Sequence, residues 1–223
     1  LDEIRHRIGL EEDEKIPMIS LLEYNRSNPP SSDYTTRDKI AVIYAEGAIV
    51  DGKGEIGRIG DKKYTDIVQD IIRSEQTRAV VLRVNSPGGS AMASEQIWRS
   101  LQLAREEGKP VVVSMGDYAA SGGYYIAMAA DSILAEPNTI TGSIGVFAAF
   151  PVMSELSEDK LGIHWDTVKT APLATLLSPF FPVSEQERKI LQANTDSFYE
   201  TFLKRVADGR GLSRDSVHAI AQG

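Results

Sequence analysis

The sequence predicts an α/β protein with a mainly parallel β-sheet core flanked by helices. Two apolar runs, "AVVLRVN" at 79–85 and "PVVVSM" at 110–115, are typical of strands buried on both faces of a sheet. Between them, apolar residues recur at helical spacing over about 91–107. This alternation indicates βαβ units, in which neighbouring strands run parallel.

Segments on either side extend the same alternation. "KIAVIYAEG" at 39–47 predicts a strand, apolar residues at helical spacing over 64–72 predict a helix, and "IHWDTVK" at 163–169 predicts another strand. A long helix is expected from Ser184, because "SEQE" has the form of a capping box between Ser184 and Glu187. The apolar residues of this helix recur at helical spacing as far as residue 206.

Composition excludes several classes of function. The chain has 223 residues, 42% of them hydrophobic, which allows one sizeable core. A net charge of −8 disfavours nucleic-acid binding. The absence of cysteine excludes disulfides, thiolate metal sites and cysteine proteases. No apolar run approaches the roughly 18–20 residues that span a bilayer, and no motif calls for a metal or a cofactor.

The first 38 residues differ from the rest. The stretch "NRSNPPSSDYTTRD" at 25–38 is polar and contains two adjacent prolines, a composition typical of a linker. We therefore expect the main domain to span 39–223.

Two glycine-rich turns follow the two central strands. "NSPGGS" at 85–90 follows the first and "ASGG" at 120–123 follows the second. Sites in open α/β sheets gather where strands end and helices begin, and unpaired backbone N–H groups there can hold an oxyanion. We predict that Gly88 or Gly89 gives one N–H group and that Gly122, just after Ser121, gives another.

Ordinary alternatives exist for each of these motifs. A Gly-Gly pair after a strand also forms a plain turn, and a serine before a helix also serves as an N-cap. A phosphate-binding loop is disfavoured because "SPGGS" lacks the GKS or GKT ending.

Three motifs in order carry a resemblance to a known family. "VLRVNSPGGS", "GDYAASGGYYIA" and "TGSIGVF" together resemble the signal peptide peptidase A family, also called protease IV, from about residue 39 onward. The resemblance implies a ClpP/crotonase-like fold and a membrane-associated serine peptidase with a Ser–Lys dyad that degrades cleaved signal peptides. It assigns the nucleophile to Ser121.

A serine nucleophile needs a neighbouring base, and the sequence does not supply an obvious one. ClpP-type triads place their histidine soon after the serine, but residues 122–163 contain none; the three histidines of the chain are His6, His164 and His218. A buried lysine can serve instead, because desolvation disfavours its ammonium form.

The lysine that the family uses is missing from its expected position. In short members it falls within a segment whose counterpart here is "KTAPLATLLSP" at 169–179, where Ala174 occupies the lysine position and Thr175 replaces an aspartate. Lys169 matches a flanking lysine. Long members carry the serine in their second half and the lysine in their first half, and their second halves share the "PLA" run.

The resemblance to long members implies several further expectations. This chain is expected to be the C-terminal half, with 1–38 as the tail and joint of a preceding half that supplies the lysine. Ser143 in "GSIG" is a candidate for orienting that lysine or for capping a turn. A homo-oligomer, tetrameric in long members, is implied. So is an anchor outside this sequence that holds the catalytic domain on the periplasmic side of the bacterial inner membrane.

Two other functions compete with the peptidase. The absent lysine is compatible with a non-catalytic half-domain that binds peptides or mediates assembly. A crotonase-type acyl-CoA enzyme also uses paired backbone N–H groups, although "ASGG" with a nucleophilic serine has no role in one.

Overall fold

The computed structural model describes residues 9, 11, 15, 20 and 37–222. The chain divides into two compact units, Leu1–Arg37 and Asp38–Gly223. The predictions for 1–38, including its linker, and the candidate base His6 fall almost entirely outside the described residues.

The elements of the second unit are, in order, β1 (Lys39–Glu46), β2 (Ala48–Val50), β3 (Arg58–Gly60), α3 (Asp61–Arg73), β4 (Thr77–Ser86), α4 (Ala91–Glu106), β5 (Val111–Ala120), α5 (Gly122–Ala127), β6 (Ser132–Leu134), β7 (Ile140–Gly142), the short π-helix η1 (Leu156–Lys160), α6 (Glu185–Arg210) and α7 (Arg214–Ala221).

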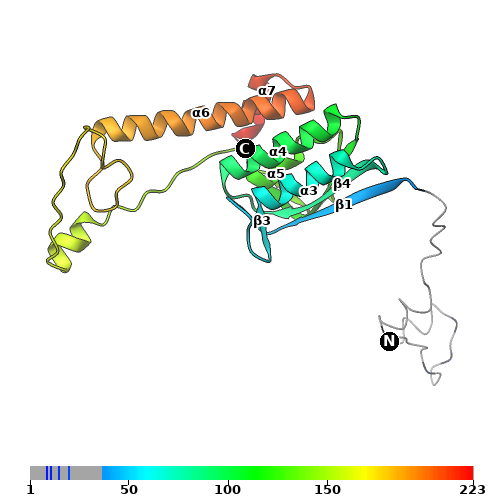
Figure 1. Ribbon diagram of the computed structural model, residues 1–223, viewed down its shortest axis with the longest axis horizontal. Coiled ribbons are helices and arrows are strands. Elements are labelled where there is room, and N and C mark those ends of the chain that lie inside the picture. The colour runs from blue at the N-terminus through cyan, green and yellow to red at the C-terminus, as the bar shows by residue number, and fades with distance from the viewer. Residues whose placement is uncertain (1–8, 10, 12–14, 16–19, 21–36, 223) are drawn as a thin grey trace. The chain divides into compact units, whose positions relative to one another are not determined.

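The core of the second unit is a parallel sheet. Its strand order is β1-β4-β5-β6, and β7 pairs with the end of β5. The edge strand β1 is drawn in blue in Figure 1. Every pair of strands is parallel, and Leu82 of β4 lies between Ile43 of β1 and Val113 of β5. The predicted α/β class with a mainly parallel sheet is confirmed.

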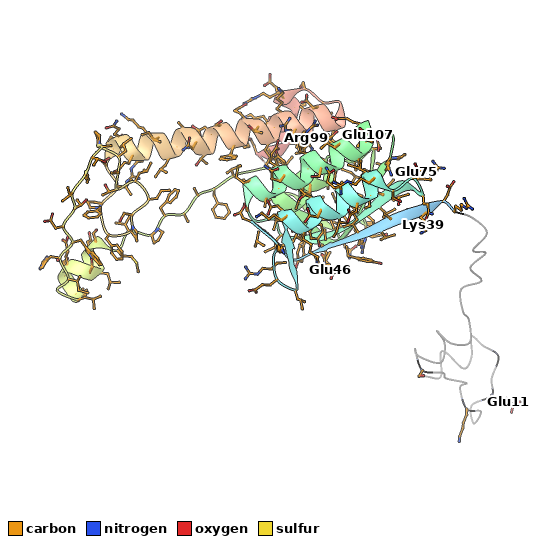
Figure 2. All side chains as sticks on the ribbon, in the orientation of Figure 1. Glu11, Lys39, Glu46, Glu75, Arg99 and Glu107 are labelled. Atoms are coloured by element: carbon orange, nitrogen blue, oxygen red, sulfur yellow. The ribbon has the colours of Figure 1, made fainter. Side chains whose placement is uncertain are left out.

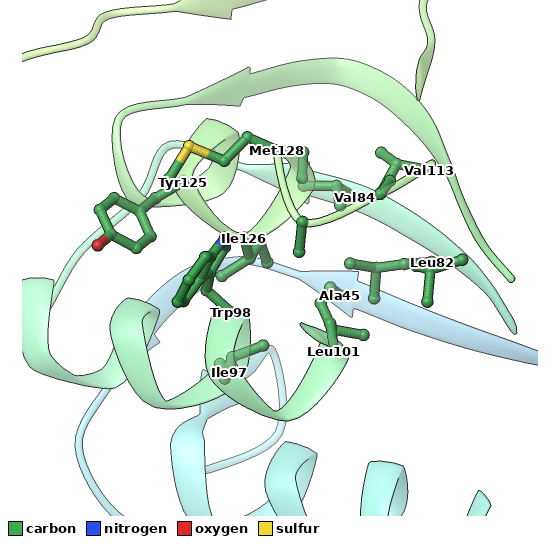
Figure 3. Packing of buried hydrophobic residues seen from close by; sticks show 14 of the residues in the cluster. Ala45, Leu82, Val84, Ile97, Trp98, Leu101, Val113, Tyr125, Ile126 and Met128 are labelled. Atoms are coloured by element: carbon green, nitrogen blue, oxygen red, sulfur yellow. The ribbon is translucent and has the colours of Figure 1, made fainter. Parts of the chain in front are cut away.

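Helices cover one face of this sheet. Alternate residues of β4, namely Val80, Leu82 and Val84, are almost completely buried, and α3, α4 and α5 contribute to the same apolar core. Figure 3 shows side chains of β1, β4 and β5 facing Ile97 and Leu101 of α4. The residues between them on β4 are only half-buried, so the prediction of strands buried on both faces was wrong. An unbroken apolar run does not reveal which face is covered, because its outward positions are apolar too.

The other face of the sheet keeps apolar side chains exposed. Ile40, Val42 and Tyr44 of the edge strand β1 are 53–66% exposed, whereas Ile43 and Ala45, which alternate with them, are buried in the core. Lys39 and Glu46, at the two ends of β1, are exposed as well, as Figure 2 shows.

Helix α6 begins as the sequence predicts. The Ser184 hydroxyl accepts a hydrogen bond from the Glu187 N–H group, and the Glu187 carboxylate accepts one from the Ser184 N–H group, so the capping box is confirmed. The C-terminal part of α6 packs on the core, where Phe202 lies 4.8 Å from Tyr125 between ring centroids. Arg210 donates to the carbonyls of Met128 and Ala130.

The strand predicted at 163–169 is wrong. Residues 162–169 carry no strand, and Val168 is 98% exposed. A strand needs a neighbour to pair its backbone groups, and none of the described strands lies beside this segment. Within the described residues, no helix is both long enough and apolar enough to cross a bilayer.

Candidate active site

Ser121 occupies a sharp turn between β5 and α5. Its backbone has φ 51° and ψ −121°, a conformation that an L-residue with a side chain rarely adopts. The turn is fixed by two hydrogen bonds: the Ser121 N–H group donates to the Gly142 carbonyl at 2.9 Å, and the Tyr125 N–H group donates to the Ser121 carbonyl at 2.8 Å. A strained strand-to-helix turn of this kind is how α/β-hydrolases expose a nucleophilic serine.

The two glycine turns meet at this serine, as predicted from their places after β4 and β5. A Cβ atom added at Gly88 would lie 2.6 Å from the Gly122 nitrogen and 3.0 Å from the Ser121 Cβ atom. A Cβ atom at Gly122 would lie 3.2 Å from the Gly89 nitrogen. The backbones of both turns are therefore in direct contact, and any side chain at position 88 would push them apart.

Of the N–H groups predicted to face an oxyanion, two have no acceptor within the described part of the chain. The Gly88 N–H group donates to the Ser86 hydroxyl at 3.1 Å. No hydrogen bond from the Gly89 or Gly122 N–H group is found among residues 37–222. These two donors, on adjacent backbones, are free to bind an oxygen atom next to Ser121.

Strand β2, which the sequence does not predict, holds the first glycine turn. The Ile49 N–H group donates to the Gly88 carbonyl, and the Ser90 N–H group donates to the Ile49 carbonyl, each at 2.9 Å. The Ser90 hydroxyl also donates to Asp51 at 2.8 Å. The only signal in the sequence is the apolar triplet "AIV" at 48–50, which is too short to predict a strand.

A cavity of about 490 Å³ adjoins Ser121. Helices α4, α5 and α6 line it together with residues 145–147. Its walls are largely apolar, and the large side chains among them are Met92, Tyr125, Val146, Phe147, Phe198 and Phe202. The volume suits a side chain or a short peptide segment, since ligand sites in proteins span about 300–1,000 Å³.

A hydrogen-bonded network lies at one wall of this cavity. The Glu95 carboxylate on α4 accepts hydrogen bonds from the Tyr125 hydroxyl and, at 2.6 Å, from Arg205 of α6. The Arg205 guanidinium also stacks 4.0 Å from the centre of the Trp98 ring. Burial and the contact with Glu95 raise the pKa of the Tyr125 hydroxyl far above its usual range, so this tyrosine stays protonated and donates.

The residues that line the cavity, all from the described part of the chain, include neither lysine nor histidine. His218 is hydrogen-bonded to Tyr199 at 2.8 Å, and His164 is exposed. Lys169 is exposed too and lies 5.9 Å from the Phe181 ring centre. None of the candidate bases in the described residues therefore reaches the serine.

Ser143 is exposed and is not part of the cavity wall. Its φ of 49° fits a turn residue. Within the described residues, no group of three or more His, Cys, Asp or Glu side chains is arranged to hold a metal ion.

Comparison with known proteins shows which family the chain belongs to. The family "Peptidase family S49" matches residues 103–223, and "Clp protease" matches residues 36–140. The chain belongs to peptidase family S49. The second match agrees with the Clp protease-like α/β fold.

Curated relatives extend this similarity over most of the chain. Protease 4 of Haemophilus influenzae is 42% identical over 96% of this chain and 35% of its own length. The chloroplastic serine protease SPPA of Arabidopsis thaliana is 35% identical over 99% of this chain and 33% of its own length. The putative signal peptide peptidase SppA of Enterococcus faecium is 34% identical over 83% of this chain and 55% of its own length. The chain spans about a third of the length of the first two of these relatives.

Proposed function

We propose that this chain is the serine-bearing part of an endopeptidase in which Ser121 is the nucleophile. The observation that carries the proposal is the strained turn that presents Ser121 beside two free N–H groups and an apolar cavity. Strained backbone persists where the surroundings fix it, and it gathers at active sites. Membership of family S49 supports the same function.

The proposed chemistry is acyl transfer. The Ser121 oxygen attacks the carbonyl carbon of a peptide bond while a base accepts its proton, and the Gly89 and Gly122 N–H groups bind the resulting oxyanion. The leaving amine takes that proton as the tetrahedral intermediate collapses. Water then hydrolyses the ester bond to Ser121 and regenerates the hydroxyl.

The base is proposed to be a lysine from a preceding half of the same protein. Ala174 stands at the family's lysine position, and the cavity wall in residues 37–222 supplies neither lysine nor histidine. On this proposal, 39–223 forms the C-terminal peptidase half, and Ser143 orients the incoming lysine.

The proposed substrates are cleaved signal peptides. Apolar cavity walls suit the apolar segments of such peptides, and one relative is named a putative signal peptide peptidase. Assembly as a homo-oligomer and attachment to the bacterial inner membrane, with this domain on the periplasmic side, belong to the same proposal.

Substitution of Ser121 in the full-length protein tests the function. Ser121→Ala is expected to reduce hydrolysis of casein or of a signal peptide by at least about 10³-fold, because the reaction loses its nucleophile. Ser197→Ala is the matched control, since Ser197 lines the same cavity from α6 but lies outside both glycine turns. Equal, measurable hydrolysis by the wild type and Ser121→Ala would refute Ser121 as the nucleophile. No hydrolysis by either protein would favour a non-catalytic peptide-binding half-domain.

A further inference from the structure

One charged side chain lines the cavity beside Ser121. Among the lining residues, all of which belong to the described part of the chain, Glu95 alone carries a formal charge at neutral pH. Helix α4 places its carboxylate in a wall that is otherwise apolar or neutral, and its side chain is 29% exposed. A free carboxylate in a specificity pocket selects basic substrate side chains.

Both oxygens of this carboxylate are already engaged. Oε1 accepts from the Arg205 guanidinium at 2.6 Å, and Oε2 accepts from the Tyr125 hydroxyl. Arg205 is not itself part of the cavity wall. The planar guanidinium of Arg205 packs against the Trp98 ring, 4.0 Å from the ring centre, and this contact holds it in place. The charge of Glu95 is thus neutralised from outside the cavity by a cation that a substrate does not touch.

This neutralisation disfavours a basic substrate side chain. A lysine or arginine that entered the cavity would lose its hydration and would find a carboxylate whose charge Arg205 already offsets and whose two oxygens each already accept a hydrogen bond. An apolar side chain would instead gain from burial against the large apolar groups of the wall.

We propose that Arg205 and Tyr125 neutralise Glu95 and thereby make this cavity select apolar substrate side chains over basic ones. The proposal rests on the peptidase function proposed above and assigns specificity-determining roles to three residues on three helices. Sequence spacing does not reveal the group, since Glu95 and Arg205 are 110 positions apart.

A purely structural clamp between α4 and α6 is the alternative interpretation. Partly buried ion pairs often add little net stability compared with apolar packing. In addition, the Nε atom of Arg205 is buried and has no hydrogen-bond partner within the described residues. A structural clamp would affect folding or the rate for every substrate, but not the choice between substrates.

The test compares two fluorogenic peptides in the full-length protein. The peptides are identical except that leucine or lysine precedes the cleaved bond, and the readout is the ratio of their kcat/KM values. The wild type is expected to favour leucine. Arg205→Met keeps an unbranched chain against Trp98 and leaves Glu95 unpaired, so it should shift the ratio toward lysine by about 10- to 100-fold.

Two further variants isolate the charge. Tyr125→Phe keeps the ring and removes one donor to Glu95, so it should shift the kcat/KM ratio in the same direction by a smaller factor. If Arg205→Met does not fold, this variant alone tests the proposal. The double variant Glu95→Gln with Arg205→Met removes the carboxylate and should restore the leucine preference. Arg214→Met is the matched control, because Arg214 pairs with Glu200 away from this cavity.

Each outcome is decisive. An unchanged ratio in both Arg205→Met and Tyr125→Phe overturns the proposal, even if all rates fall, because it indicates a structural clamp. A wild type that cleaves both peptides equally well overturns it too. A wild type that cleaves neither peptide and does not react with a fluorophosphonate refutes the peptidase function itself, and the specificity proposal with it.

Discussion

Ser121 adopts a backbone conformation that costs free energy, and the surrounding residues hold it there. Its φ of 51° and ψ of −121° lie in a region that glycine occupies easily and other residues rarely do. Such strain costs about 1–3 kcal/mol. The hydrogen bond to Gly142 and the contact of Gly88 with Ser121 and Gly122 leave the turn little freedom to relax. The strain is consistent with a serine placed for reactivity.

Replacing Ser121 with glycine should therefore stabilise the protein while it removes the nucleophile. We expect Ser121→Gly to have a free energy of unfolding about 1 kcal/mol higher than that of Ser121→Ala, since alanine keeps the strain. Urea unfolding of the two variants measures the difference. A glycine variant less stable than the alanine variant would contradict the strain argument.

A side chain at Gly88 should damage the site because of its contacts. The added Cβ atom would lie 2.6 Å from the Gly122 nitrogen and would displace an oxyanion donor. We expect Gly88→Ala to lower kcat by about 10²-fold or more. Gly108→Ala is the matched control: Gly108 also has a positive φ, of 77°, but open space around it, so it should lose stability without loss of kcat. Equal kcat values for the two variants would argue against a role for this contact.

Single elements differ in how well the sequence predicts them. The strands β1, β4 and β5 and the helices α3, α4 and α6 follow from runs and periodicities long enough to exceed chance. The three-residue strands β2, β3, β6 and β7 do not, because they are too short to show a periodicity and are defined by the strands that they pair with. The segment 163–169 is the opposite case: its composition favours a strand, but the structure gives it no partner strand and no strand forms.

The capping box at the start of helix α6 lowers the pKa of one of its own members. Hydrogen bonds from the Ser184 hydroxyl and N–H group lower the pKa of the Glu187 carboxyl below its ordinary value of 4.5. The ionised Glu187 carboxylate thus stabilises the start of the helix above pH 4.5, and this stabilisation is lost as the pH falls through the lowered pKa. Ser184→Ala should raise that pKa, as measured by NMR titration.

A matched control for this titration is Ser213→Ala. It removes the N-cap of α7 and should leave Glu187 unchanged. A Glu187 pKa that stays the same in Ser184→Ala would show that the capping box does not set it.

At the scale of the whole molecule, the sequence predicts the meeting of the two glycine turns but not the cavity beside them. Parallel strands end at the same edge of a sheet, so turns after β4 and β5 must lie close together. The cavity needs α6 to return to the core, which brings Arg205 to Glu95 and Phe202 to Tyr125. These contacts depend on the path of residues 143–184, for which the sequence predicts only the strand at 163–169 that the structure lacks.

The separation of serine and base leads to a prediction for the isolated chain. Because the described cavity wall lacks a lysine and a histidine, the 223-residue chain alone should be close to inactive on casein. Lys169→Ala should not change any residual rate, since Lys169 lies against Phe181 outside the cavity. Strong cleavage by the isolated chain that survives Lys169→Ala would disprove the need for a base from elsewhere.

The most direct measurement is to identify the residue that a fluorophosphonate modifies in the full-length protein. Peptide mapping by mass spectrometry should find the adduct on the Ser121 oxygen, and the adduct should be absent from Ser121→Ala and present in Ser197→Ala. An adduct on a different residue, or none on a protein that still cleaves peptides, would contradict the account.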